Sequence, residues 1–125
     1  MPDKIFFIFG SLTGFLSVAA GAFGAHALKN KLTPEMLAIF ETAARYQMFH
    51  ALALLAAAWA ATQFHPGFAR SAGWFFFLGT VVFSGSLYIL VFTGVKAWGA
   101  VTPLGGLMLL AGWLMLAFSA IQSRA

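Results

Sequence analysis

The sequence predicts an all-α integral membrane protein, a four-helix bundle with an amphipathic interfacial helix before its second membrane span. Of its 125 residues, 62% are hydrophobic and 8% are charged, whereas soluble domains carry roughly 25% charged residues. A soluble chain of this length leaves much of its surface in water and has no room to bury so many apolar side chains. The apolar residues also form long uncharged runs, each about the length that crosses a bilayer. We therefore expect a single transmembrane domain over residues 1–125.

The first half of the chain predicts two spans joined by an amphipathic segment. Residues 5–28 contain no Asp, Glu, Lys or Arg, and this run is longer than the roughly 7–15 apolar residues of a cleaved signal peptide. A helix start follows at Thr33-Pro34-Glu35, with Thr33 as N-cap and Pro34 in the first turn. Over residues 34–45 the apolar and charged side chains fall on opposite faces, as in helices that lie at the membrane interface. We expect this segment to lead into a second span at about 46–64.

Two short breaks define the second half. His65-Pro66-Gly67 ends the second span, and the third span is expected at about 72–93. After the turn around residues 94–99, the fourth span is expected at about 100–121. Turns this short make consecutive spans antiparallel neighbours. Basic residues flank the spans on both sides in nearly equal number, so the charge rule assigns no orientation.

Small residues recur on the predicted spans at helical spacing. Glycine and serine allow helix backbones to approach closely, and close packing is what holds helices together in lipid. We expect helix–helix packing at Gly10, Gly14, Ser17, Gly21 and Gly24 in the first span and at Gly105 and Gly112 in the fourth.

Polar residues gather toward one side of the predicted membrane. Antiparallel threading brings the end of span one, the start of span two, the end of span three and the start of span four to the same side. These segments hold the candidate ligand-binding residues His26, Tyr46, Gln47, His50, Ser84, Ser86, Tyr88 and Thr102. They either fasten the bundle through interhelical hydrogen bonds or form a shallow site for a lipid headgroup, a quinone or another small polar molecule.

Other kinds of site have little support. The chain has no cysteine, and His26 and His50 alone make an incomplete metal shell. The three carboxylates, Asp3, Glu35 and Glu41, lie outside the spans, so we predict no catalytic residue, no metal and no cofactor. The basic residues are scattered singly, which argues against binding to nucleic acid.

Four short sequence motifs occur in order along the chain. They are GAFGAH at residues 21–26, YQMFH at 46–50, FSGSLY at 83–88 and TPLGG at 102–106. Together they resemble the YgdD-like family of small inner-membrane proteins, whose function is unknown. The resemblance implies a multi-pass protein of the cell membrane with four spans and cytoplasmic termini.

The expected function is that of a non-enzymatic membrane protein. It would serve as an accessory or interaction subunit, or bind a lipid-like small ligand at the polar cluster. The expected partners are the lipid bilayer and either another membrane protein or further copies of the chain. The alternatives are an oligomeric small-solute transporter or channel and a metal or quinone redox protein.

Overall fold

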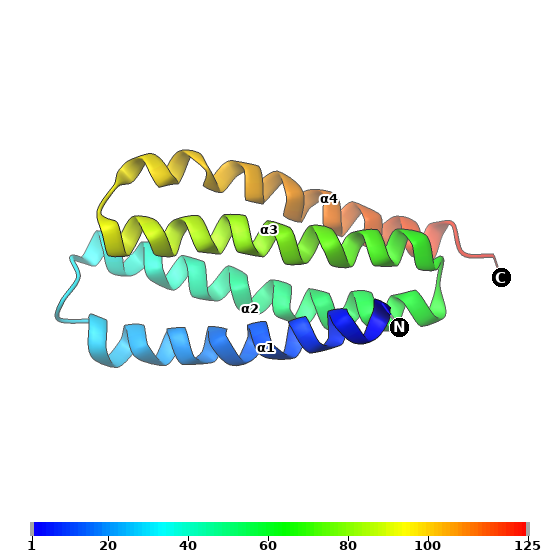
Figure 1. Cartoon of the computed structure of the whole chain (residues 1–125), viewed down its shortest axis with the longest axis horizontal. Helices are drawn as coiled ribbons and strands as arrows, with labels where there is room; N and C mark the ends of the chain where they lie inside the picture. Colours follow the sequence, from blue (N-terminus) through cyan, green and yellow to red (C-terminus); the bar gives the residue numbers. More distant parts are fainter. Residues whose placement is uncertain (1, 125) are drawn as a thin grey trace.

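The computed structural model describes residues 2–124 and consists of four long helices (Figure 1). They are α1 (Pro2–Phe23), α2 (Pro34–Gln63), α3 (Pro66–Thr93) and α4 (Thr102–Ile121). A π-helical turn, η1 (Gly24–Leu28), extends α1, and a 3₁₀ turn, η2 (Lys96–Ala100), precedes α4. The part of the chain described here contains no β-strand, which confirms the all-α expectation.

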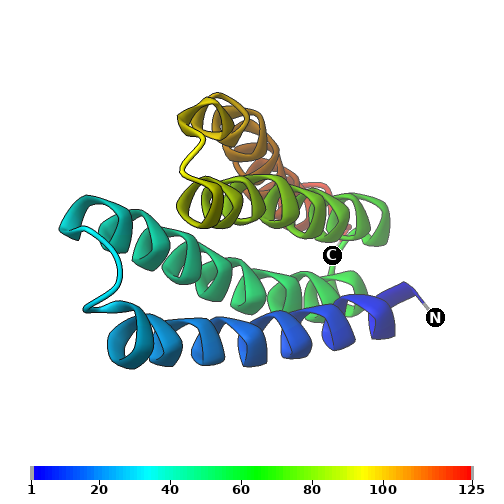
Figure 2. The ribbon, with the colours of Figure 1, turned by 60° about the vertical axis from the view of Figure 1, so that its left-hand side comes forward.

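The four helices lie side by side in chain order and do not close into a ring. Each helix packs on the next one in the chain, and within residues 2–124 α1 and α4 do not contact each other. Figures 1 and 2 show α1 and α4 at opposite edges, with α2 and α3 between them. The two neighbours of each inner helix make only a few contacts with each other, and hollows remain over α2 and α3.

The helix α2 is the most enclosed of the four. It runs without interruption from Pro34 to Gln63, so the amphipathic segment at 34–45 and the segment expected to form the second span lie on one helix. Thr33 caps it as expected, since its hydroxyl accepts a hydrogen bond from the Met36 amide at 3.2 Å. Phe40 and Ala43 are buried, so the apolar face of the amphipathic segment packs inside the bundle.

The helix α3 is longer than the span expected within it. The helix begins at Pro66, before the span expected at about 72–93, because proline suits the first turn of a helix and His65 caps it. The His65 Nδ1 atom accepts a hydrogen bond from the Phe68 amide at 3.5 Å. The His65 amide also donates to the Ser119 carbonyl at 3.0 Å, which ties this turn to α4. The fourth helix begins at Thr102, because residues 96–100 form η2.

The outer surface has the character of a lipid-facing one. Among the described residues, three helical segments are long and apolar enough to cross a membrane: Asp3–Leu28, Pro66–Thr93 and Lys96–Ile121. On α1 and α4, large apolar side chains such as Phe15, Leu107 and Leu114 are more than half exposed. A monomer in water rarely exposes so much contiguous apolar surface. The bundle is therefore embedded in the bilayer.

Small residues form the contacts between neighbouring helices. A Cβ atom on Gly10 would lie 2.8 Å from the Ala51 carbonyl, and one on Gly24 would lie 2.8 Å from the Phe40 ring. A Cβ on Gly112 would lie 2.7 Å from the Phe76 ring. At each of these glycines the neighbouring helix leaves no room for a Cβ atom.

Two more of the small residues expected to pack, Gly14 and Ser17, also face α2, whereas Gly21 does not. Gly14 lies against Ala51, where an added Cβ would be 3.6 Å from that side chain. The Ser17 hydroxyl donates to the Ala44 carbonyl at 2.6 Å. Gly21 differs from the expectation, because no atom of another helix would lie within 4 Å of an added Cβ. The helices α1 and α2 diverge toward the loop that joins them (Figure 2), and at the next turn it is the large Phe40 side chain, not the α2 backbone, that reaches Gly24.

Both ends of the described chain lie at the same end of the bundle (Figure 1). At this end an ion pair joins α1 to α3, with the Arg70 Nε atom 3.2 Å from the Asp3 carboxylate. The Arg70 side chain is 41% exposed, so the pair contributes at most about 1 kcal/mol. Packing, rather than charge, holds the helices together.

Candidate functional site

The predicted polar cluster divides into separate groups in the structure. One pair crosses from α2 to α4 through His50, a second group joins α1, α2 and α3 through Gln47, and a third joins α3 to α4 through Ser86. His26 belongs to none of them. It lies on η1 with its side chain exposed, away from the other predicted residues.

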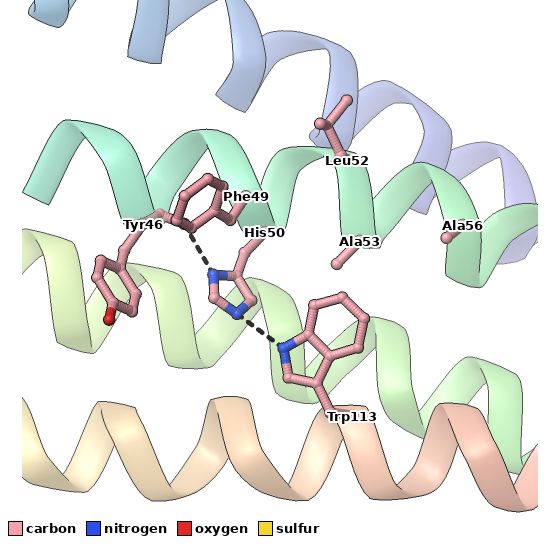
Figure 3. A pocket seen from close by; sticks show the side chains of 7 residues that line it. All are labelled: Tyr46, Phe49, His50, Leu52, Ala53, Ala56 and Trp113. Carbon is pink, nitrogen blue, oxygen red and sulfur yellow. Dashed lines mark hydrogen bonds between the residues drawn. The ribbon is translucent and has the colours of Figure 1, made fainter.

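His50 and Trp113 form the link between α2 and α4. The Trp113 indole N–H donates to the His50 Nε2 atom at 3.1 Å (Figure 3). The His50 Nδ1 atom lies 2.7 Å from the Tyr46 carbonyl oxygen of the preceding turn. Since the indole can only donate and the carbonyl can only accept, the proton of a neutral His50 ring is on Nδ1. Both contacts thus specify the same tautomer.

Aromatic rings enclose the His50 imidazole on several sides. The Tyr46 ring stacks near it at 6.3 Å, and the Phe76 and Trp113 rings each lie 5.8 Å from it. Phe76 is fully buried and packs edge-on against Trp113 at 4.9 Å. His50 itself is 5% exposed. This packing fixes the direction in which the imidazole points, across α3 toward α4 (Figure 3).

A groove lies between α2 and α4, over α3, and the His50–Trp113 pair stands in it. One compartment has a volume of about 650 Å³, and the other about 500 Å³. Both are lined by Tyr46, His50 and Trp113. The first is completed by Phe49, Leu52, Ala53 and Ala56, and the second by Phe83, Pro103, Gly106, Leu107, Leu109 and Leu110. The lining residues carry no formal charge in the neutral state of His50, and most are apolar.

Gln47 joins three helices on the other side of α2. Its Nε2 group donates to the Thr13 carbonyl of α1 at 3.0 Å, and its Oε1 atom accepts from the Tyr88 hydroxyl of α3 at 2.7 Å. Gln47 is 8% exposed. A smaller hollow of about 330 Å³ lies against this pair, lined also by Leu16, Ala20, Phe23, Phe40 and Phe92. The amide therefore fastens α1 and α3 to α2.

The serines and the threonine make local or interhelical bonds. The Ser84 hydroxyl donates to the Ala43 carbonyl of α2 at 2.8 Å. Ser86 and Thr102 share a hydrogen bond of 2.6 Å between α3 and α4, and the Ser86 hydroxyl also lies 2.9 Å from the Phe83 carbonyl. These three side chains are engaged within the protein, and none of them lines either compartment of the groove.

The two histidines proposed as weak metal ligands do not come together. Both ring nitrogens of His50 are already hydrogen-bonded within the protein, and His26 is exposed on η1. In residues 2–124, no group of three or more histidine, aspartate or glutamate side chains is arranged to hold a metal ion.

Trp113 is the site residue that the sequence interpretation did not include. It lies in the middle of an apolar helix among leucines, a position at which a tryptophan is expected to pack against its neighbours. Its indole N–H could have indicated a polar partner, because a tryptophan away from water needs a hydrogen-bond acceptor. His50 is the acceptor that the structure supplies.

Comparison with known proteins places this fold in a family. The family model "Protein of unknown function (DUF423)" matches residues 20–106. A UPF0382 membrane protein of Staphylococcus haemolyticus is 46% identical over 121 residues, which cover 95% of this chain and 97% of the relative. No solved structure matches the chain.

Two further relatives cover almost the whole chain. The UPF0382 membrane protein YwdK of Bacillus subtilis is 42% identical over 120 residues, covering 95% of this chain and 98% of the relative. The UPF0382 inner membrane protein YgdD of Escherichia coli K12 is 39% identical over 130 residues, covering 99% of this chain and 95% of the relative. These matches confirm the family resemblance that was based on the four short sequence motifs. The chain belongs to the UPF0382 (DUF423) family of membrane proteins, whose function is unknown.

Proposed function

We propose that this chain is a non-enzymatic membrane protein that binds a lipid-like ligand in the groove between α2 and α4. The observation that carries the proposal is an apolar groove between α2 and α4 in which the buried His50 imidazole is hydrogen-bonded to the partly exposed Trp113 indole. Ligand sites are typically apolar clefts with a few convergent polar groups. Each compartment falls within or near the usual size range of about 300–1,000 Å³.

The surroundings of His50 favour binding over catalysis. Both ring nitrogens are occupied by protein partners, and no carboxylate lines the groove. A general base needs a free acceptor atom within reach of the proton that it abstracts, and a nucleophile needs an adjacent base that activates it. Here the imidazole instead bridges two helices, which suits recognition of a bound molecule.

We further propose that all four helices cross the membrane with both termini on the cytoplasmic side. The support is that α2 lies between α1 and α3 and turns Gln47 and His50 into the bundle. Burial explains why a helix of lower hydropathy is tolerated, since its polar groups meet protein partners instead of lipid. The cytoplasmic side rests on the family resemblance.

Filling the groove tests the proposed ligand site. Ala56→Phe and Gly106→Leu would each place a bulky side chain into one compartment, and Gly106 has room because the nearest atom to an added Cβ is 3.9 Å away. We expect the double variant to lose most of the lipid that co-purifies with the wild-type protein in mild detergent. The measurement is mass spectrometry of lipids extracted from equal amounts of folded protein.

Gly21→Leu is the matched control, because it adds a side chain to an open part of the surface. It should retain the wild-type amount of lipid. The proposal is contradicted if the wild-type protein carries no tightly held lipid, or if the groove-filled variant retains as much as the control. It is equally contradicted if a stoichiometric protein partner occupies the groove in place of lipid.

A further inference from the structure

The hydrogen-bonding groups in the groove restrict the chemistry of its occupant. Nδ1 of His50 is held by the Tyr46 carbonyl, so Nε2 presents a lone pair. The Trp113 indole presents an N–H. A ligand group placed between these two atoms must therefore donate to His50 and accept from Trp113 at the same time.

Few lipid groups meet that requirement. A hydroxyl both donates and accepts, whereas an ester or quinone carbonyl and an ionised phosphodiester only accept. A phosphodiester is also disfavoured because no lysine or arginine lines the groove to pair its charge. Burying an unpaired charge is costly. The favoured ligand is thus neutral and carries a free hydroxyl.

The groove offers space for apolar chains on both sides of the pair. The compartments of about 650 Å³ and about 500 Å³ meet at Tyr46, His50 and Trp113. A hydroxyl at this point would leave one apolar chain for each compartment. Diacylglycerol is a lipid of this shape, with one free hydroxyl and two acyl chains.

The structure also provides a way for the hydroxyl to enter. In residues 2–124, the Trp113–His50 bond is the only side-chain hydrogen bond between α2 and α4. Trp113 is 46% exposed, so one side of its ring is open and the indole has space to turn away from His50. Insertion would replace one hydrogen bond by two.

We infer that the groove takes a neutral lipid alcohol, whose hydroxyl inserts between His50 and Trp113 while its chains fill the two compartments. This inference rests on the proposed function, because it names the class of ligand for the same groove. An acceptor-only analogue would satisfy Trp113 but leave His50 Nε2 without a donor, and an unsatisfied buried acceptor carries a penalty. The groove should therefore discriminate between a diacylglycerol and its acetyl ester.

Quenching of Trp113 fluorescence tests this discrimination. The full chain, with Trp59, Trp74 and Trp98 replaced by phenylalanine, is placed in phosphatidylcholine nanodiscs. Diacylglycerol with brominated chains is then compared with its acetylated form, which has the same chains but no hydroxyl. We expect the diacylglycerol to reach half-maximal quenching at a mole fraction about tenfold lower than its acetylated form does. The difference corresponds to the one hydrogen bond to His50 that the acetylated form does not make.

A variant at His50 isolates the role of the acceptor. His50→Phe keeps an aromatic ring but removes Nε2, so the preference for diacylglycerol should fall to nearly onefold. Phe92→Leu is the matched control, because Phe92 lines the separate, smaller hollow beside Gln47 and Tyr88. This variant should keep the tenfold preference for diacylglycerol over its acetylated form. Circular dichroism confirms that both variants remain helical.

The outcomes separate this inference from the proposed function. Equal quenching by the two brominated probes, both stronger than by brominated phosphatidylcholine, overturns the hydroxyl assignment but leaves a lipid groove. Quenching no stronger than that by brominated phosphatidylcholine overturns both. An unchanged tenfold preference in His50→Phe also overturns the assignment to His50.

Discussion

Replacing Gly105 by alanine is expected to lower the free energy of unfolding by about 2–3 kcal/mol, in the range of an overpacked core. A Cβ on Gly105 would overlap the Phe83 backbone nitrogen and lie 2.8 Å from its Cα and 2.9 Å from the Gly79 carbonyl. These are backbone atoms, so no side chain can turn aside to make room. The helix α4 must move away from α3, which is the only helix it packs against extensively. Unfolding by SDS titration in mixed micelles measures the change.

Gly85→Ala is the control for this substitution. It introduces the same side chain on α3, where no atom lies within 4 Å of the added Cβ. It should leave stability unchanged or raise it slightly, since alanine favours the helix over glycine. Equal destabilisation by Gly105→Ala and Gly85→Ala would show that the α3–α4 contact is not the close one described here.

Replacing Gln47 by leucine is expected to cost about 1–2 kcal/mol of stability, because an interhelical hydrogen-bond partner is lost in a low-dielectric environment. Its amide donates to Thr13 and accepts from Tyr88. Without it, the partly buried Tyr88 hydroxyl loses its acceptor. The same SDS titration measures the loss, and Gln63→Leu, an exposed position at the end of α2, should change stability by less than about 0.5 kcal/mol.

A double-mutant cycle identifies the bond that carries this effect. Tyr88→Phe removes the hydroxyl but keeps the ring that packs on Phe40. If the Gln47–Tyr88 bond is made, the two substitutions are less than additive, because the second removes a contact already lost. Fully additive effects would mean that the two side chains do not interact in the folded protein.

Much of the architecture is predictable from the sequence because lipid imposes simple requirements. Long uncharged runs define the helices, and short turns make them antiparallel. Thr33 before Pro34 marks the start of α2, and the glycines at 10, 24, 105 and 112 mark helix contacts. The helix α3 extends the span expected at 72–93 back to Pro66, because proline, which marks a turn after His65, also begins helices.

The site was only partly predictable, because depth in the membrane does not determine which way a side chain points. His26 and His50 were expected in one cluster, yet His26 lies on an exposed face of η1. The partner of His50 is on α4, and the register between α2 and α4 is set through α3. No local pattern in either helix encodes that register. The open order of the helices, which creates the groove, likewise follows from tertiary packing alone.

A structure of the protein in nanodiscs of native lipid tests the central claim most directly, because it shows what occupies the groove between α2 and α4. We predict ordered, elongated density along Ala56 and Leu107, continuous past the His50–Trp113 pair and stronger than the lipid density on the outer faces of α1 and α4. A groove closed by α4 packing directly onto α2, or one holding lipid no more ordered than the rest of the surface, would contradict the account.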